Sequence, residues 1–584
     1  MTKPPRSSST GDLRRVALWA TLGFCCVTAP AFGQEPAAPP PPALHPPDVS
    51  GGPLLPEQAS YDVTFYDLAL RIDPADSTIG GTVTVYADVV QPMDHLVLDL
   101  DTVFTVTKIA GVGERAGPLS FERRGGRLWI TVPTLQPGQE VAARVEYYGR
   151  PRTAGRGRFI WSMTEAGQPW MGVSCEMFGA DLWWPVKDHP SDEPDSLALS
   201  FTVPRPLVAA SNGRLRGVTD NADGTRTYRW FSSMPANNYG VSVNVAPYVT
   251  VTSQYQSVAG ETFPVTFWVV PEHESQARAA LPEFLDHLRF FEELLGPYPF
   301  RSDKYGIAEV PYLGMEHQTI IAYGANFRND AMARIDWGFD ALHQHELAHE
   351  WFGNMLTPPD FNDIWLHEGF AQYMQPLYAE SRLGLAKARE LMRLMGARIR
   401  NQQAIAVGRS QTTAEAYNSE IYYKGAWILH TLRFVMGDSA FRTLLRQWTY
   451  PDPSVPVTDQ ACRCRFLTTD DFIRLASRIA GRDLEWFFRQ WIYEPGYPTF
   501  DTEWMWTPGG EGGGTLDLTV RQTQRADWPT FRVPVEVEVT AGGRTARETI
   551  ELREREATLR LSWTGPRPDR VVLDPGSWVL KGGK

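Results

Sequence analysis

The chain contains 584 residues, of which 43% are hydrophobic and 12% aromatic, and it carries a formal net charge of −12 at pH 7. A chain of this length and composition can bury large cores, and we expect it to form about two to four domains. Because the balance is acidic and no block of Lys and Arg stands out, nucleic acid and anionic membrane surfaces are not expected partners.

Residues 1–33 have the pattern of a secretory signal peptide. Arg14 and Arg15 precede a short apolar run over residues 16–28, and the small residues of 29–33 follow as a cleavage region. The apolar run is short for a bilayer span, although a retained anchor is the alternative to cleavage. We therefore expect an exported protein, periplasmic or extracellular, with no stable membrane span after cleavage.

A linker and then an all-β domain are expected next. Residues 34–56 are rich in Pro and Ala, the composition of an extended linker without a core. From Tyr61 the pattern becomes that of half-buried strands, and in one run apolar residues alternate with polar ones: Val83, Val85, Ala87 and Val89. Short runs of this kind continue to about Val251, so residues 57–255 are predicted to form an N-terminal β domain.

Helical periodicity begins near Ser275. Apolar residues recur there at spacings of three and four, as on one face of a helix: Ala280, Leu281, Phe284, Leu285, Leu288 and Phe291. Further along, Thr468 with Asp471 three residues later predicts a helix N-cap. Helical signals end at about Pro495, so residues 256–497 are predicted to form a mainly helical domain.

The strongest chemical signal in this domain is HELAHEWFGN, residues 345–354. His345 and His349 are four positions apart, so on an α-helix both imidazoles leave one face and can share a divalent metal. Glu346 is turned by about 100° from His345. It can reach a metal-bound water, which is the place of a general base. By itself this motif is a moderate signal.

A catalytic zinc site needs a third protein ligand and an open fourth position. After the helix-breaking TPPD of residues 357–360, a second helix is expected near Asp363, and it carries Glu368. An antiparallel helix pair with a short turn would bring Glu368 over the two histidines. His343 and His367 lie nearby, and such additional histidines are more often supporting or surface groups than ligands. Because the base is present as well as the ligands, the set favours catalysis over a structural metal site.

The strand pattern returns from Leu516. Four valines alternate there with polar or Pro residues, namely Val533, Val535, Val537 and Val539. Residues 498–584 are therefore predicted to form a small C-terminal β-sandwich.

Three cysteines lie outside the predicted signal peptide: Cys175, Cys462 and Cys464. An odd number allows at most one disulfide within the chain. A bridge between Cys462 and Cys464 would enclose a single residue and be strained. We therefore expect partly buried or loop cysteines.

HELAHEWFGN followed by WLHEGFA, residues 365–371, resembles the gluzincin aminopeptidases, the family of aminopeptidase N and leukotriene hydrolase. The resemblance extends over about residues 60–582. It implies a multidomain α+β fold with an N-terminal saddle-like β domain, a thermolysin-like catalytic domain and a C-terminal β-sandwich. It also implies one Zn²⁺ held by His345, His349 and Glu368.

The resemblance implies a substrate-binding motif before the zinc ligands. GMEH, residues 314–317, is similar to the family's G-x-M-E-N exopeptidase motif. The match is incomplete, since Leu313 stands where the first glycine is usual and histidine replaces the asparagine. It implies that Gly314, Met315 and Glu316 contact the substrate.

Two further roles also come from the resemblance. Glu176 precedes Pro185 by the spacing of the family's amine-binding glutamate, although Ser174 replaces the family's glutamine. YYKG, residues 422–425, is similar to a family motif whose tyrosine stabilises the oxyanion. That tyrosine matches Tyr422, and Tyr423 is the alternative if the match shifts by one residue.

An exopeptidase must recognise a protonated α-amine one residue from the scissile bond. A carboxylate fixed at that place forms charge-assisted hydrogen bonds and sets the cleavage register. We therefore expect Glu316 and Glu176 to clamp the ammonium group of peptides that have a free N-terminal amine.

The resulting prediction is a secreted zinc aminopeptidase that releases N-terminal residues from peptides, with a zinc-activated water, Glu346 as general base and Tyr422 as oxyanion stabiliser. One alternative is another zinc hydrolase on the same site, an endopeptidase or an epoxide hydrolase, which the incomplete G-x-M-E-N match leaves open. A second alternative is a non-catalytic binding protein that retains a metal. Such proteins usually lose the base or a ligand, and here all are present.

Overall fold

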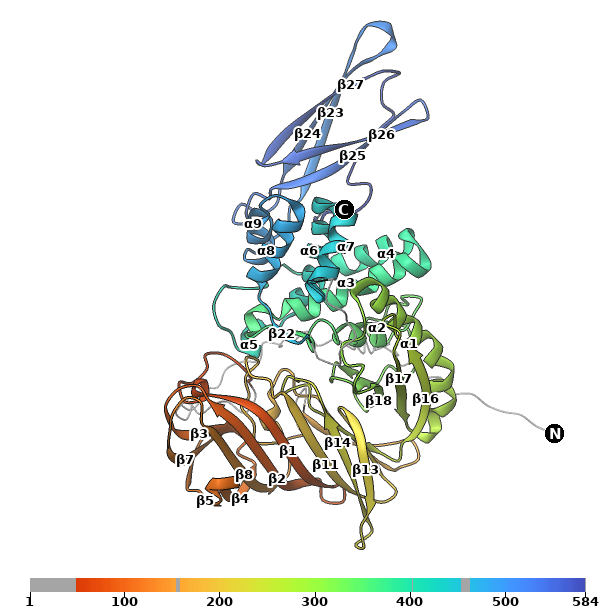
Figure 1. The fold of residues 1–584 in the computed structure, drawn as a ribbon. Helices are drawn as coiled ribbons and strands as arrows, with labels where there is room; N and C mark the ends of the chain where they lie inside the picture. Colours follow the sequence, from red (N-terminus) through yellow and green to blue (C-terminus); the bar gives the residue numbers. More distant parts are fainter. Residues whose placement is uncertain (1–48, 154–157, 402, 453–462, 583–584) are drawn as a thin grey trace, which may run out of the picture.

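The computed structural model describes the chain over four ranges, residues 49–153, 158–401, 403–452 and 463–582. The predicted signal peptide of residues 1–33, and the predicted linker up to residue 48, lie outside the described residues. A β-rich body, a helical body and a second β body follow one another from bottom to top of Figure 1. The predicted multidomain α+β fold class is therefore confirmed.

The N-terminal body is built from strands whose inward residues alternate along the chain. Eight strands form one sheet in the order β13-β14-β11-β1-β2-β8-β4-β5, beside sheets β12-β15-β10-β9 and β3-β7-β6. The three sheets share one apolar core. Their bounds are β1 (Tyr61–Asp73), β2 (Thr78–Val89), β3 (Met93–Asp99), β4 (Phe104–Gly111), β5 (Gly117–Pro118), β6 (Phe121–Arg124), β7 (Arg127–Leu135), β8 (Glu140–Gly149), β9 (Phe159–Met163), β10 (Pro169–Val173), β11 (Ser196–Pro204), β12 (Val208–Ser211), β13 (Arg214–Asp220), β14 (Thr225–Ser232) and β15 (Val243–Ala246).

The second body packs helices against a five-stranded sheet of order β16-β17-β18-β20-β19. Its strands are β16 (Val249–Gln256), β17 (Thr262–Val269), β18 (Tyr305–Glu309), β19 (Gly314–Met315), β20 (Ile321–Tyr323), β21 (Leu356–Thr357) and β22 (Arg465–Phe466). Its helices are α1 (Glu274–Leu295), α2 (Ala341–Ala348), α3 (Trp365–Leu383), α4 (Leu385–Gly396), α5 (Thr413–Ala416), α6 (Ser419–Met436), α7 (Asp438–Thr449), α8 (Thr469–Ala480) and α9 (Glu485–Ile492).

The first strand of this sheet lies across the predicted domain boundary at residue 255. β16 pairs with β17, and Val251 and Tyr255 are buried in the core of the helical body. Alternation along a strand shows which residues face inward, but it does not show which sheet the strand joins. The boundary predicted from the strand pattern therefore falls inside the β16–β17 pair.

The helix that carries His345, α2, ends earlier than the sequence pattern predicts. α2 stops at Ala348, whose carbonyl oxygen accepts from the backbone N–H groups of Trp351 and Phe352 at 3.1 and 3.0 Å. Gly353 then takes φ +139°, a conformation that glycine adopts without strain. The chain therefore turns before the prolines of TPPD. A connection over residues 349–364, which ends in a 3₁₀ turn, joins α2 to α3 in place of the predicted short turn.

The C-terminal body consists of two three-stranded sheets, β23-β24-β27 and β26-β25-β28, around a core of their alternating apolar residues. The strands are β23 (Phe500–Pro508), β24 (Gly514–Gln522), β25 (Val533–Ala541), β26 (Arg544–Leu552), β27 (Glu556–Trp563) and β28 (Arg570–Leu573). This arrangement agrees with the predicted sandwich.

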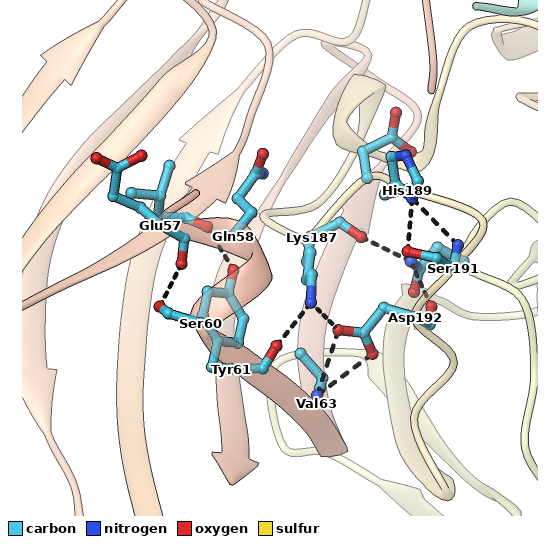
Figure 2. Close-up of polar contacts among 12 residues, drawn as sticks. Glu57, Gln58, Ser60, Tyr61, Val63, Lys187, His189, Ser191 and Asp192 are labelled. Atoms are coloured by element: carbon cyan, nitrogen blue, oxygen red, sulfur yellow. Dashed lines mark hydrogen bonds and ion pairs between the residues drawn. The ribbon is translucent and has the colours of Figure 1, made fainter. Parts of the chain in front are cut away.

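A buried lysine holds the loop region of the N-terminal body against its first strand (Figure 2). The Lys187 ammonium group donates to the Tyr61 carbonyl oxygen at 2.7 Å and pairs with Asp192. Asp192 in turn accepts from the Val63 N–H at 3.3 Å. These contacts satisfy the buried charges and fix residues 187–192 on the start of β1.

A second buried lysine joins the first two bodies. Lys304 of the helical body donates to the carbonyl oxygens of Ser211 and Gly213 at 2.8 and 2.6 Å. Burial lowers the pKa of Lys304 to about 7. The contact fixes the end of β12 and the following turn against the helical body.

Two smaller findings concern membranes and cysteines. Within the described ranges no helix combines the length and apolar character needed to cross a membrane. Cys175 is a buried free thiol in a loop, and Cys464 is half-buried in a loop, as expected. Cys464 is in addition disulfide-bonded, which the sequence pattern does not favour. Spacing alone does not show whether the local backbone brings two sulfurs together. Cys462 lies outside the described residues.

Candidate metal centre and active site

Three side chains from α2 and α3 converge at one point. The Nε2 atoms of His345 and His349 are 3.2 Å apart. Glu368 Oε2 lies 3.2 Å from His345 Nε2 and 3.5 Å from His349 Nε2. All three residues are buried. The structure therefore brings together the three ligands predicted from the sequence.

This arrangement fits one zinc ion. Tetrahedral bonds of about 2.0–2.1 Å place ligand atoms roughly 3.3–3.4 Å apart, which is close to the three separations of 3.2, 3.2 and 3.5 Å in the structure. The Nδ1 of His349 lies 2.9 Å from the Phe352 carbonyl oxygen. This contact assigns the proton to Nδ1 and leaves Nε2 with the lone pair that a metal needs.

The helix that carries the histidines is fixed from behind. Asp340 caps α2 by accepting from the His343 N–H at 2.9 Å. The His343 ring stacks on Phe284 with 3.7 Å between ring centroids, and its Nδ1 lies 2.9 Å from that of His287. His343 is therefore a buried supporting group, in agreement with the sequence-based expectation.

Glu346 lies beside the zinc ligands with its carboxylate against Gly314. A Cβ atom at position 314 would lie 2.6 Å from Glu346 Oε1, closer than van der Waals contact permits. Glycine at this position therefore leaves the room that the Glu346 carboxylate occupies. Burial, followed by the charge of Glu316, raises the pKa of Glu346 well above its usual value.

Two more carboxylates come from different bodies. Glu176 lies in the loop after β10, and Glu316 follows β19. One oxygen atom of each, and one ring nitrogen of His367, lie within 4.8 Å of one another. Burial is the largest cause that raises the pKa of each glutamate, and the Glu316 charge raises that of Glu176 further. Because Glu176 and Glu316 are the residues predicted to clamp a substrate amine, we call them the amine end of the site, and His345, His349 and Glu368 the metal end.

Tyrosine hydroxyls hold both carboxylates of the amine end. Tyr239 donates to Glu316 Oε1 at 3.0 Å, and Tyr417 donates to Glu176 Oε2 at 2.7 Å. The other oxygen of Glu176 is buried and has no hydrogen-bond partner among the described residues. It is therefore an available acceptor beside Glu316.

The two neighbouring tyrosines of YYKG point to different partners. Tyr422 Oη lies 2.6 Å from Tyr417 Oη, and its ring centroid lies 6.1 Å from that of His345. The Tyr423 hydroxyl accepts from Arg398 at 3.5 Å. Tyr422 is therefore the residue whose hydroxyl lies beside the metal end.

One cavity of about 160 Å³ is lined by the metal end, the amine end, Glu346, Tyr417 and Tyr422. Gly314 and Met315 form part of its wall, as the motif predicts. The remaining wall of the cavity is largely apolar and includes Met177, Phe178, Leu313, Met332 and Leu342. The cavity can therefore take an apolar group next to the carboxylates and the zinc ligands.

Two family profiles match the chain. The Peptidase M1 N-terminal domain matches residues 63–239, and the Peptidase family M1 domain matches residues 281–491. The chain belongs to peptidase family M1. Membership and the ligand geometry together assign one Zn²⁺ to the metal end.

Solved M1 structures share this fold. An M1 zinc metallopeptidase of Deinococcus radiodurans, a mutant bound to a Tyr-Ser-Ala substrate, is 26% identical, with a TM-score of 0.61 over 74% of this chain and 94% of that chain. Aminopeptidase A of Legionella pneumophila, in complex with aspartic acid, has a TM-score of 0.72 over 90% of this chain and 60% of that chain. At 16% identity it supports the fold alone.

Curated M1 relatives are longer. Endoplasmic reticulum aminopeptidase 1 of Homo sapiens is 24% identical over 414 residues, which are 66% of this chain and 43% of the relative. The chain thus spans less than half the length of the first curated relatives it matches.

Two positions depart from the G-x-M-E-N motif that residues 313–317 resemble, Leu313 and His317. Leu313 is 40% exposed at the wall of the cavity. His317 is fully buried, and neither ring nitrogen has a partner among the described residues. Burial lowers the pKa of both His317 and His367 to about 3, so both imidazoles are neutral at working pH.

Sequence reasoning missed Tyr417 and Tyr239. Neither belongs to a motif that we identified, although Tyr417 lies five positions before Tyr422 and just ahead of α6. Their hydroxyl contacts join residues from different bodies, so a local pattern could not have shown them.

Proposed function

We propose that this M1 chain is a zinc-dependent aminopeptidase that releases N-terminal residues from peptides with a free amine. The observation that carries the proposal is the pair of buried carboxylates at the amine end, beside the zinc ligands. No lysine or arginine lies among the described residues of this cavity wall, so the two carboxylates suit an ammonium group. The peptide bound by the Deinococcus relative and the aminopeptidase activity named for the human relative support this choice.

The places of the side chains support the following catalytic roles. His345, His349 and Glu368 would hold the zinc ion, which would supply Lewis acidity and lower the pKa of a water molecule there. Glu346 takes the proton of the attacking water and delivers it to the leaving amine. Tyr422 donates a hydrogen bond to the oxygen that becomes negative in the transition state.

The amine end determines which peptide bond of the substrate is cleaved. Glu176 and Glu316 accept hydrogen bonds from the substrate ammonium, which places the first peptide bond at the metal end. An acetylated amine has no charge to pair with, and it would leave two desolvated carboxylates uncompensated. The expected substrates are therefore peptides with a free N-terminus, and an apolar first side chain would suit the apolar wall.

We also propose export from the cytoplasm, on the pattern of residues 1–33. Expression of the full chain with a C-terminal tag in a bacterial host, followed by fractionation and N-terminal sequencing, tests this. A mature protein that begins near residue 34 in the periplasm or medium is expected. An uncleaved chain in the cytoplasm would contradict export.

The function is tested with amino-acid p-nitroanilides that have either a free or an acetylated α-amine, with and without a chelator. Chelator-sensitive release from only the free-amine set is expected. Release from both sets would retain the metal chemistry but remove the amine role of Glu176 and Glu316. Release from neither set, followed by internal cleavage of longer peptides, would favour an endopeptidase.

A further inference from the structure

The hydroxyl group of Tyr417 lies where the two ends of the cavity meet. Its oxygen lies 2.7 Å from Glu176 Oε2 and 2.6 Å from Glu368 Oε1. A third neighbour, the hydroxyl oxygen of Tyr422, lies 2.6 Å away. One side chain therefore contacts the amine end, a zinc ligand and the tyrosine beside the metal.

This cluster has more acceptors than protons. A tyrosine hydroxyl donates one hydrogen bond, and an ionised carboxylate only accepts. Tyr417 can therefore donate to Glu176 or to Glu368, while Tyr422 donates to Tyr417. When a substrate ammonium donates to Glu176, the Tyr417 proton becomes available to Glu368. Occupation of the amine end thus changes the hydrogen bonding of a zinc ligand.

The contact also selects which oxygen of Glu368 meets the metal. Oε2 faces the ligand nitrogens of His345 and His349 at 3.2 and 3.5 Å, and Oε1 lies 2.6 Å from the Tyr417 hydroxyl oxygen. Hydrogen bonds to ligating carboxylates orient them, and their loss typically costs about 10–100-fold in metal affinity or activity. Tyr417 therefore lies where such a contact matters.

The backbone holds Tyr417 between two capped helices. The N–H of Tyr417 donates to the Thr413 carbonyl oxygen at 2.9 Å, and Asn418 caps α6 by accepting from the Glu420 N–H at 2.8 Å. The Thr413 hydroxyl donates to the Met177 carbonyl oxygen at 2.7 Å. The segment that positions Tyr417 is therefore bonded to the loop that carries Glu176.

We propose that Tyr417 is a positioning residue whose single hydroxyl proton serves Glu176 or Glu368, so that it orients the zinc ligand and couples ammonium binding to it. This inference rests on the proposed aminopeptidase function for its kinetic consequences. Its structural consequence, an oriented zinc ligand, can be measured without turnover.

The first test measures the zinc dissociation constant by competition with a chelator. Tyr417→Phe keeps the ring and removes the hydroxyl, and it is expected to weaken zinc binding by about 10–100-fold. Tyr378→Phe is the matched control, because Tyr378 lies on the same helix as Glu368 and donates to another carboxylate, Asp286, at 2.8 Å. The control is expected to bind zinc as the wild type does. Equal zinc affinity in Tyr417→Phe and the control would overturn the inference.

The second test is a double-mutant cycle on kcat and KM with a free-amine substrate. Tyr417→Phe and Glu176→Gln are each expected to raise KM. In the double variant, the fold-increase in KM should be at least about threefold smaller than the product of the two single fold-increases. Increases in KM that multiply in full would show that Tyr417 acts independently of Glu176 and would contradict the coupling.

A third measurement needs no loss of the hydroxyl and remains valid if Tyr417→Phe does not fold. A fluorine label on the Tyr417 ring should shift its ¹⁹F resonance on addition of zinc and again on addition of an amino-acid amide. The same label at Tyr378 should not shift. A Tyr417 resonance that neither addition moves would contradict the inference. If the wild type cleaves no free-amine peptide, the proposed function fails, while the zinc and fluorine measurements still decide the role of Tyr417.

Discussion

The metal end and the amine end of the site are built in different ways. The metal end lies within α2, α3 and the turn that follows α2, so its three ligands belong to one helical unit. The amine end takes Glu176 from the N-terminal body and Glu316 from the helical body, and a tyrosine holds each of them. The first end is local in the sequence, and the second exists only when two bodies are packed together.

This difference separates chemistry from selectivity. Changes at the metal end should reduce turnover for every substrate, because they remove the attack itself. Changes at the amine end should mainly affect recognition of the free amine. The predictions below test this division, from the largest expected effect to the smallest.

Removal of the metal should have the largest effect. Dialysis against a chelator is expected to reduce hydrolysis to background, because Lewis acidity and the acidified water are lost together. One equivalent of Zn²⁺ should restore activity, measured with a free-amine p-nitroanilide and metal analysis. Full activity in protein shown to be metal-free would contradict the metal end.

Glu346→Gln should come next. The amide keeps the size of the side chain but cannot take a proton, so kcat is expected to fall by about 10²–10⁴-fold. Zinc content should be unchanged, because Glu346 is not a ligand. Activity close to that of the wild type would remove Glu346 as the base.

Tyr422→Phe should lower kcat by about 10²–10³-fold, because a donor to the developing negative charge is lost. Tyr423→Phe is the neighbouring comparison, and its loss should be much smaller because its hydroxyl contacts Arg398. Steady-state kinetics of both variants decide between the two residues. A larger loss in Tyr423→Phe would reverse the assignment.

Glu316→Gln should act mainly on KM for free-amine substrates. A charge-assisted hydrogen bond contributes about 1.5–3 kcal/mol, so KM should rise by roughly 10–100-fold, with a smaller change in kcat. The preference for free over acetylated amines should shrink by a similar factor. If kcat falls while the preference is kept, Glu316 does not recognise the amine.

The junction between the bodies should have the smallest effect on catalysis, and its expected effect is a pH dependence of stability. Burial lowers the pKa of Lys304 to about 7, whereas an unfolded chain keeps this proton up to about 10.4. Between these values the unfolded state binds more protons, so this residue's contribution to the free energy of unfolding rises with pH and is lost as pH falls to 7.

The measurement for Lys304 is denaturant unfolding of the wild type and Lys304→Met between pH 7 and 10. The difference between them should change with pH by at most about 1.4 kcal/mol per unit. Lys108→Met, which removes an exposed lysine, should show no such change. A flat difference for Lys304→Met would mean that the buried amine does not lose its proton in the folded state.

The sequence predicted the metal end well, for a physical reason. His345, Glu346 and His349 lie within about one helical turn, and Glu368 lies on the next helix, so periodicity and spacing define the group. The end of α2 was misplaced because the turn depends on Gly353 rather than on the prolines that follow.

The amine end could be predicted only in part. Glu316 and Glu176 came from resemblance to family motifs, but Tyr417 and Tyr239 followed from no pattern, because their hydroxyl contacts depend on how separate segments pack. In the same way, the strand pattern indicated β16 but not the sheet that it joins.

The most direct test of the account is mass spectrometry of a single unmodified peptide and its N-acetylated twin after incubation with the zinc-loaded protein. We predict a ladder of products that lose residues one at a time from the free N-terminus, and an intact acetylated peptide. Internal cleavage of both peptides would contradict the account, because the metal end would then act without the amine end.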